Sequence, residues 1–140
     1  MRYKFIEHMS DVIIEAQGKT FSEAFENIAD GMFTQMGSDE ITNDPGSFSV
    51  SQKANTLDEL VVNALSEILA ECEIERVIPK KVNVLAFDEI EKSISLEVLG
   101  GSGIPRNIIK AVTFHELKVE KKLGKGGKTD EWTIRVLFDI

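Results

Sequence analysis

The chain ends on a stretch in which two kinds of residue alternate at every second position. The apolar row of this stretch is Trp132, Ile134, Val136 and Phe138. This period of two predicts a strand with at least one buried face, running to the last residue. Asp139 and the terminal carboxylate of Ile140 then lie about one residue apart on an ordered element. Two negative charges at that separation repel each other unless a cation or hydrogen-bond donors neutralise them.

Two other stretches carry apolar residues with helical spacing. Each begins with a capping box, in which a threonine is followed three residues later by a glutamate: Thr20 with Glu23, and Thr56 with Glu59. The apolar stripes that follow predict helices over about 20–36 and 57–74. Cys72 falls in the second stripe and is expected to be a buried core thiol.

The remaining apolar runs predict strands, at 3–6, 12–16, 47–53, 81–99 (a hairpin), 111–121 and the final stretch. Residues 7–11 interrupt the first two strands as a turn, a bulge or a group of side chains collected for a site. The glycine-rich segment 100–105 is expected to be a flexible connection. The order of elements predicts an α+β fold: a single domain over 1–140, with two main helices packed on a largely antiparallel or mixed sheet.

Charge narrows the possible partners. The 140 residues include 16 Lys and Arg and 24 Asp and Glu, for a net charge of −8. That balance argues against broad, non-specific nucleic-acid binding and fits a metal site or a basic protein partner. The acidic face of the second helix is interpreted as solvated, with a docking surface as the alternative. Lysines 118, 121, 122, 125 and 128 form a basic patch, which either solubilises a hairpin or contacts RNA or an acidic partner.

Cellular location follows from features that the sequence lacks. A single cysteine allows no internal disulfide and indicates a reducing compartment. No signal-peptide core and no run of about 18 apolar residues is present, so we expect a cytoplasmic protein without membrane contact.

Few residues suggest chemistry. No nucleophilic triad is recognisable, and neither histidine lies in a metallohydrolase spacing. The remaining candidates are acidic: Asp11, Asp139 and the Ile140 carboxylate. Carboxylates are hard ligands that suit Ca²⁺, Mg²⁺ or Mn²⁺ rather than Zn²⁺. The sequence alone does not show that the two ends of the chain meet.

Four motifs occur in order along the whole chain, within 3–14, 18–27, 109–115 and 138–140. They comprise Glu7-His8-Met9-Ser10-Asp11, Gly18-Lys-Thr-Phe-Ser-Glu-Ala-Phe-Glu-Asn27, Ile109-Lys-Ala-Val-Thr-Phe-His115 and Phe138-Asp-Ile140. In this respect the chain resembles the archease family. The first motif departs from the family's Asp-His-Thr-Ala-Asp, but it keeps Asp11. The segment 100–107 lacks the family's usual Gly-Glu and later His, which leaves partner recognition there open to change.

The resemblance implies a function. Archeases are partners of the tRNA-splicing RNA ligase, which joins a 2′,3′-cyclic phosphate or 3′-phosphate end to a 5′-hydroxyl. They promote formation of the ligase's covalent guanylate and its multiple turnover, and they are not regarded as enzymes. The family carries a divalent-metal site to which calcium is assigned. Carried over, its ligands are Asp11, Asp139 and Ile140, with Mg²⁺ or Mn²⁺ as alternatives to Ca²⁺.

Three further residues are expected to have functional roles. The resemblance assigns one to Lys110, which would otherwise be a plain surface lysine. His8 is either a structural hydrogen-bonding residue or one that supports the metal site or the partner contact. His115 shares the predicted strand face of Leu117 and Val119, which favours a half-buried, hydrogen-bonded side chain over a partner contact.

Two other functions remain open. A metal-dependent phosphoesterase would use the same carboxylates to activate water, although no general base is recognisable. An RNA-binding or chaperone module would use the basic patch, and its RNA binding would be sensitive to salt.

Overall fold

A computed structural model describes residues 2–7, 10–38, 44–106 and 108–140. Within them lie two helices and seven strands. In chain order these are β1 (Tyr3–Glu7), β2 (Asp11–Gly18), α1 (Phe21–Gln35), β3 (Pro45–Lys53), α2 (Leu57–Ile74), β4 (Val77–Asp88), β5 (Ser93–Ser102), β6 (Ala111–Lys122) and β7 (Glu131–Asp139). Both predicted helices and all the predicted strands are confirmed. None of the described helices is both long enough and apolar enough to cross a membrane.

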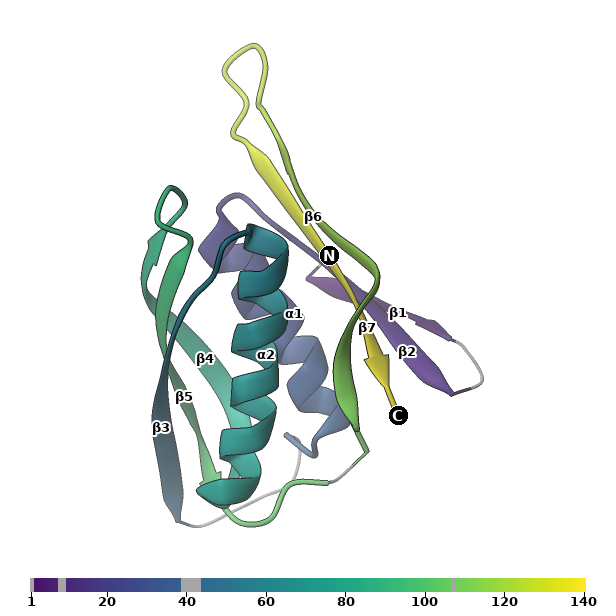
Figure 1. Ribbon diagram of the computed structural model, residues 1–140, viewed down its shortest axis with the longest axis vertical. Helices are drawn as coiled ribbons and strands as arrows, with labels where there is room; N and C mark the ends of the chain where they lie inside the picture. Colours follow the sequence, from purple (N-terminus) through teal and green to yellow (C-terminus); the bar gives the residue numbers. More distant parts are fainter. Residues whose placement is uncertain (1, 8–9, 39–43, 107) are drawn as a thin grey trace.

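The strands form two sheets, with the helices between them (Figure 1). One sheet has the order β1-β2-β7-β6 and the other β3-β5-β4. Every neighbouring pair in both sheets is antiparallel. The predicted α+β class is confirmed, but two sheets take the place of the expected single one. Both helices contact both sheets, because their apolar stripes are too wide for one sheet to cover.

Both helices begin at the predicted caps. The Thr20 hydroxyl accepts a hydrogen bond from the Glu23 amide at 3.0 Å, and the Thr56 hydroxyl accepts one from the Glu59 amide at 3.1 Å. Each bond satisfies an amide that has no partner within the helix. These local signals fix where each helix starts before any tertiary contact is made.

The core joins the two sheets through an aromatic cluster. The Phe21 ring at the start of α1 stacks on Phe87 of β4 at 4.0 Å and meets Trp132 of β7 edge-on at 5.4 Å. Cys72 is fully buried, as predicted. Burial, with smaller effects from Glu71 and Glu73, raises the pKa of its thiol to about 12.

The segment after β5 differs from its prediction. The strand continues through Gly100 and Gly101 to Ser102, where a flexible connection was expected. Gly100 pairs with Pro79, and a Cβ at this position would collide with the carbonyl oxygen of Ile78. The glycine therefore allows a close approach of two strands rather than flexibility.

The alternation predicted for β6 is interrupted by a bulge. Residues 114–117 lie opposite only Val136, because Thr113 pairs with Leu137 and Lys118 pairs with Arg135. Glu116 adopts a positive φ of 55° to close the bulge. The bulge leaves Phe114 57% exposed and His115 exposed. The prediction of a half-buried His115 was therefore wrong, since it assumed unbroken alternation.

Candidate metal and partner site

The two predicted aspartates lie directly opposite each other. Asp11 begins β2, Asp139 ends β7, and the two residues are register partners in the antiparallel pair. The Cβ atoms of such partners are about 4.5–5.5 Å apart, and their side chains leave the same face of the sheet. The Ile140 amide donates a hydrogen bond to the Ser10 carbonyl at 3.2 Å, which keeps Ile140 next to the two aspartates.

The third strand of the site is β6. Its first residue, Ala111, pairs with Asp139 on the side away from Asp11. The Lys110 amide donates a hydrogen bond to the Asp139 carbonyl at 2.7 Å. Lys110 is therefore fixed beside the aspartates although its own side chain is exposed. Asp11, Asp139, Ile140 and Lys110 all meet at one end of the four-stranded sheet.

The carboxylates lie on the sheet face that points away from the helices. Along β7, Val136 and Phe138 are buried in the core cluster, so Asp139 faces the other way and is exposed. Glu15 and Arg135 follow on the same face, and their side chains form an ion pair at 3.0 Å. No such cation is paired with Asp139 within the described part of the chain. Its charge is left for a ligand or solvent to balance.

The donor set suits a shared cation rather than an enclosed one. Across the described residues, no group of three or more His, Cys, Asp or Glu side chains is close enough to hold a metal ion. Ca²⁺ takes 6–8 oxygen ligands, whereas Mg²⁺ commonly binds one or two carboxylates together with water and phosphate oxygens. Two opposed aspartates therefore fit an ion whose remaining ligands come from main-chain oxygens, water or a second molecule.

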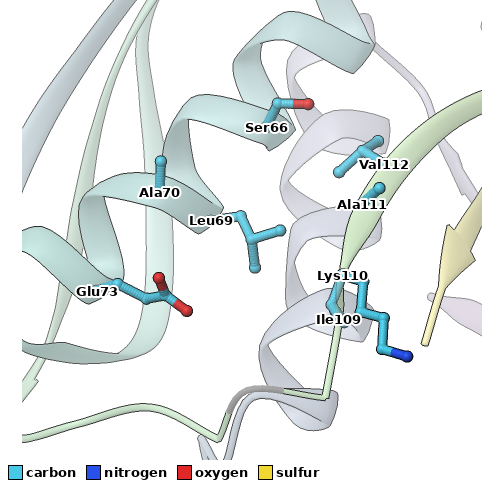
Figure 2. A pocket seen from close by; sticks show the side chains of 8 residues that line it. All are labelled: Ser66, Leu69, Ala70, Glu73, Ile109, Lys110, Ala111 and Val112. Atoms are coloured by element: carbon cyan, nitrogen blue, oxygen red, sulfur yellow. The ribbon is translucent and has the colours of Figure 1, made fainter.

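A cleft of about 560 Å³ adjoins this end of the sheet. Figure 2 shows its lining: Ser66, Leu69, Ala70 and Glu73 from α2, and Ile109, Lys110, Ala111 and Val112 from the start of β6. The Lys110 side chain extends away from α2, while Glu73 lies on the helix side (Figure 2). The apolar floor between two opposite charges can accept an apolar side chain of a partner protein.

The other predicted residues are placed differently. His8 lies outside the described residues. His115 is in the β6 bulge, where its amide donates a hydrogen bond to the Thr113 hydroxyl at 3.3 Å. It is not in the row formed by Asp11, Asp139 and Ala111. Two features were not predicted from the sequence: the exposure of Phe114 and the cleft between α2 and β6. The bulge that exposes Phe114 and the spacing between α2 and β6 have no local sequence signal.

This arrangement defines a class: a domain with two antiparallel sheets around two helices, and an acidic pair at one sheet end. The same fold occurs in the solution structure of Methanobacterium thermoautotrophicum protein 1598, with a TM-score of 0.64 and 22% identity over 99% of this chain and 98% of the other. The sequence model of the Archease protein family matches residues 3–140. The chain belongs to this family, as its motifs predicted.

Curated relatives agree with this assignment. The protein archease of Methanosarcina mazei is 32% identical over 146 residues, covering 99% of this chain and 96% of the relative. The archease-like protein of Dictyostelium discoideum is 24% identical and covers 99% of this chain and 93% of the relative. These names specify no reaction.

Proposed function

We propose that this protein is a non-catalytic, cytoplasmic activator of the tRNA-splicing RNA ligase. It promotes formation of the covalent ligase guanylate and thereby permits multiple turnover. Membership of the archease family supports the choice of partner. The observation that carries the mechanism is the direct pairing of Asp11 with Asp139 at an exposed sheet end, with Lys110 bonded beside them.

In this mechanism the acidic pair holds a divalent cation, Ca²⁺ in the first instance, with Mg²⁺ or Mn²⁺ as alternatives. Asp11 and Asp139 supply carboxylate oxygens, and Ile140 supplies a main-chain or terminal oxygen. The cation would balance negative charge on the nucleotide phosphates at the ligase. Lys110 adds a second positive charge on the same edge. The adjoining cleft between α2 and β6 receives part of the ligase surface.

The first experiment follows transfer of labelled guanylate from GTP to the purified ligase. Asp11→Asn, Asp139→Asn and Lys110→Ala are each expected to reduce the stimulation about tenfold or more, the effect of losing roughly 1.4 kcal/mol at the transition state. Asp58→Asn is the matched control, because Asp58 is an exposed aspartate on α2, outside the acidic pair. Folding of each variant is checked by circular dichroism.

Two results would contradict the proposal in different ways. Folded Asp11→Asn and Asp139→Asn variants that stimulate as well as wild type would remove the metal mechanism. A wild-type chain that stimulates no ligase would remove the function itself. Hydrolysis of cyclic-phosphate RNA by the chain alone would instead favour a phosphoesterase.

A further inference from the structure

A strongly basic segment lies far from the acidic pair, in the connection between β6 and β7. Residues 121–129 contain four lysines and no acidic residue, in a chain whose net charge is −8. We call this segment the lysine hairpin. It projects beyond the rest of the molecule, at the opposite end of β7 from the C-terminus (Figure 1). Its positive charge is therefore concentrated at one tip of the molecule, where Glu120, Asp130 and Glu131 flank it in the sequence.

The lysine hairpin is an ordered turn. The Lys128 amide donates a hydrogen bond to the Lys125 carbonyl at 3.1 Å, and Gly126 and Gly127 both have positive φ, 59° and 81°. These are the features of a two-residue type I′ turn. The Gly124 amide also donates a hydrogen bond to the Asp130 carboxylate at 2.9 Å. Lys125 and Lys128 are thus fixed about 7 Å apart or less at their Cα atoms, despite carrying like charges.

The base of the lysine hairpin is anchored to the body. The Lys121 ammonium lies 3.5 Å from the Glu89 carboxylate and 5.5 Å from the centre of the Trp132 ring. The Lys121 ammonium group therefore already has partners within the protein. Lys122, Lys125 and Lys128 instead line an open cleft of about 680 Å³, together with Leu123, Gly124, Thr129 and one acidic residue, Glu131. Three exposed lysines and one exposed glutamate therefore border the same open cleft, which keeps a net positive charge.

The side chains in the lysine hairpin favour a phosphate ligand over a protein. Lysine is depleted at protein interfaces, whose binding energy comes mainly from Trp, Tyr and Arg. Residues 121–129 contain no aromatic residue and no arginine, and their one large apolar residue is Leu123. Lysine does serve well as a point charge for phosphate groups. The absence of aromatic residues also removes the means to stack on bases, which leaves the phosphates as the main contact.

We propose that the lysine hairpin binds the phosphodiester backbone of single-stranded RNA without base preference. The assignment of this RNA as the ligase substrate rests on the function proposed above. The contact is small, about three phosphates, and this is compatible with a chain whose acidic surface repels RNA elsewhere. The lysine hairpin is therefore the part of the described chain to which we assign the RNA contact.

The lysine hairpin, as the proposed RNA contact, lies far from the Asp11–Asp139 pair. Lys122 pairs with Glu131 at one end of β7, and Ala111 pairs with Asp139 at the other. Eight strand residues of about 3.4 Å each place these pairs roughly 27 Å apart. The lysine hairpin and the acidic pair therefore cannot contact the same phosphate. With the acidic pair at the ligase, the lysine hairpin reaches RNA that extends away from the reacting end.

The test measures fluorescence anisotropy of a labelled ten-nucleotide single-stranded RNA as the purified chain is added at low salt. The hairpin variant carries Lys122→Gln, Lys125→Gln and Lys128→Gln. The matched control carries Lys19→Gln, Lys53→Gln and Lys81→Gln, three exposed lysines outside the lysine hairpin. We expect at least tenfold weaker binding for the hairpin variant and a change below twofold for the control.

Salt dependence and competition provide further readouts. Three phosphate contacts predict a slope of about −2 for the logarithm of the binding constant against that of the salt concentration. RNAs of different sequence should bind within about twofold of each other. Equal binding by wild type and hairpin variant, or no RNA binding by wild type, would overturn the proposal. Binding of a polyaspartate peptide but not RNA would assign the hairpin to an acidic protein instead.

The RNA contact can fail independently of ligase activation. Guanylylation is measured with GTP and without RNA, and here the hairpin variant should stimulate as wild type does. In multiple-turnover ligation the same variant should raise the apparent KM for RNA with little change in kcat. If wild type fails to stimulate guanylylation while hairpin-dependent RNA binding persists, the proposed function falls and the RNA contact stands.

Discussion

The carboxylates of Asp11 and Asp139 present an electrostatic problem at the scale of single residues. Like charges directly opposite each other in an antiparallel pair destabilise it by about 0.2–1 kcal/mol. A few positions along the same strands, Glu15 faces Arg135, so opposite charges meet there. Among the described residues, Asp139 has no such cationic partner, which is compatible with the proposed cation site.

The first prediction concerns Asp139→Asn. In the presence of EDTA this variant should unfold at the same or a slightly higher temperature than wild type, because the repulsion is removed. Added Ca²⁺ should raise the unfolding temperature of wild type by mass action and leave the variant unchanged. Scanning calorimetry with and without Ca²⁺ measures both effects, with Asp58→Asn as the control. An equal Ca²⁺-dependent rise in Asp139→Asn would contradict the site.

A second prediction at this scale concerns Cys72. Its pKa is raised from 9.0 to about 12, so the folded protein holds the thiol proton more tightly than the unfolded chain. The associated stability is fully present below pH 9 and is lost as pH rises from about 9 to about 12. Chemical denaturation should show a flatter pH dependence for Cys72→Ala over this range. Native wild type should also resist thiol reagents at pH 8, with full reaction only after unfolding.

The sequence provided candidate residues for the site, but it did not show how they pair. Family motifs in the sequence indicated Asp11, Asp139 and Lys110. The sequence did not show that β2 pairs with β7, nor that the register sets Asp11 opposite Asp139. The register of two strands depends on which side chains the core buries, and this is known only once the fold is known. The buried row Val136 and Phe138 fixes that register, and the sequence shows the row but not its partner.

At the scale of elements, β6 carries the least regular backbone of the site. The positive φ of Glu116 is a conformation that glycine adopts without strain and glutamate does not. The bulge also exposes Phe114 on the edge strand that leads to Lys110. Bulges on edge strands redirect side chains and discourage pairing with other chains.

The third prediction tests this strain. Glu116→Gly should raise the free energy of unfolding by about 0.5–1 kcal/mol, because the positive φ no longer meets a Cβ. Glu120→Gly, in the regular part of the same strand, should lower it by a similar amount. Urea denaturation of both variants measures the difference. A destabilised Glu116→Gly would show that the bulge gains more from its side chain than it loses in strain.

Elements with local signals were predicted well, and those defined by contacts at a distance were not. The helix starts at Thr20 and Thr56 were correct because each cap lies within four residues of sequence. The continuation of β5 through Gly100 was missed. Gly100 is required there by the nearby Ile78 backbone, which is not visible in the sequence.

At the scale of the whole molecule, the helices bridge two sheets that share few strand-to-strand links. Phe21 is the clearest bridge, since its ring contacts β4 through Phe87 and β7 through Trp132. The sequence predicted the apolar stripe of α1 but not that it would be covered from both sides. The wide stripe was the available signal, and it was interpreted as the interface with a single sheet.

The fourth prediction follows from this bridge. Phe21→Ala should lower the free energy of unfolding by about 3–5 kcal/mol, because a fully buried ring is removed from the cluster. Phe21→Leu should lose less, since most of the volume is retained. Trp132 fluorescence reports on the four-stranded sheet, while far-ultraviolet circular dichroism reports on the whole domain. Coincident transitions are expected in wild type, and separate transitions would show that the sheets unfold independently.

The central place of β7 in its sheet has a consequence for biosynthesis. β7 lies between β2 and β6, although it is the last of the described strands in the sequence. A nascent chain therefore cannot complete this sheet until residues 131–139 have left the ribosome. A product truncated before β7 would expose the unpaired edges of β2 and β6 and would tend to aggregate. The pairing that sets Asp11 opposite Asp139 can therefore form only after β7 has been synthesised.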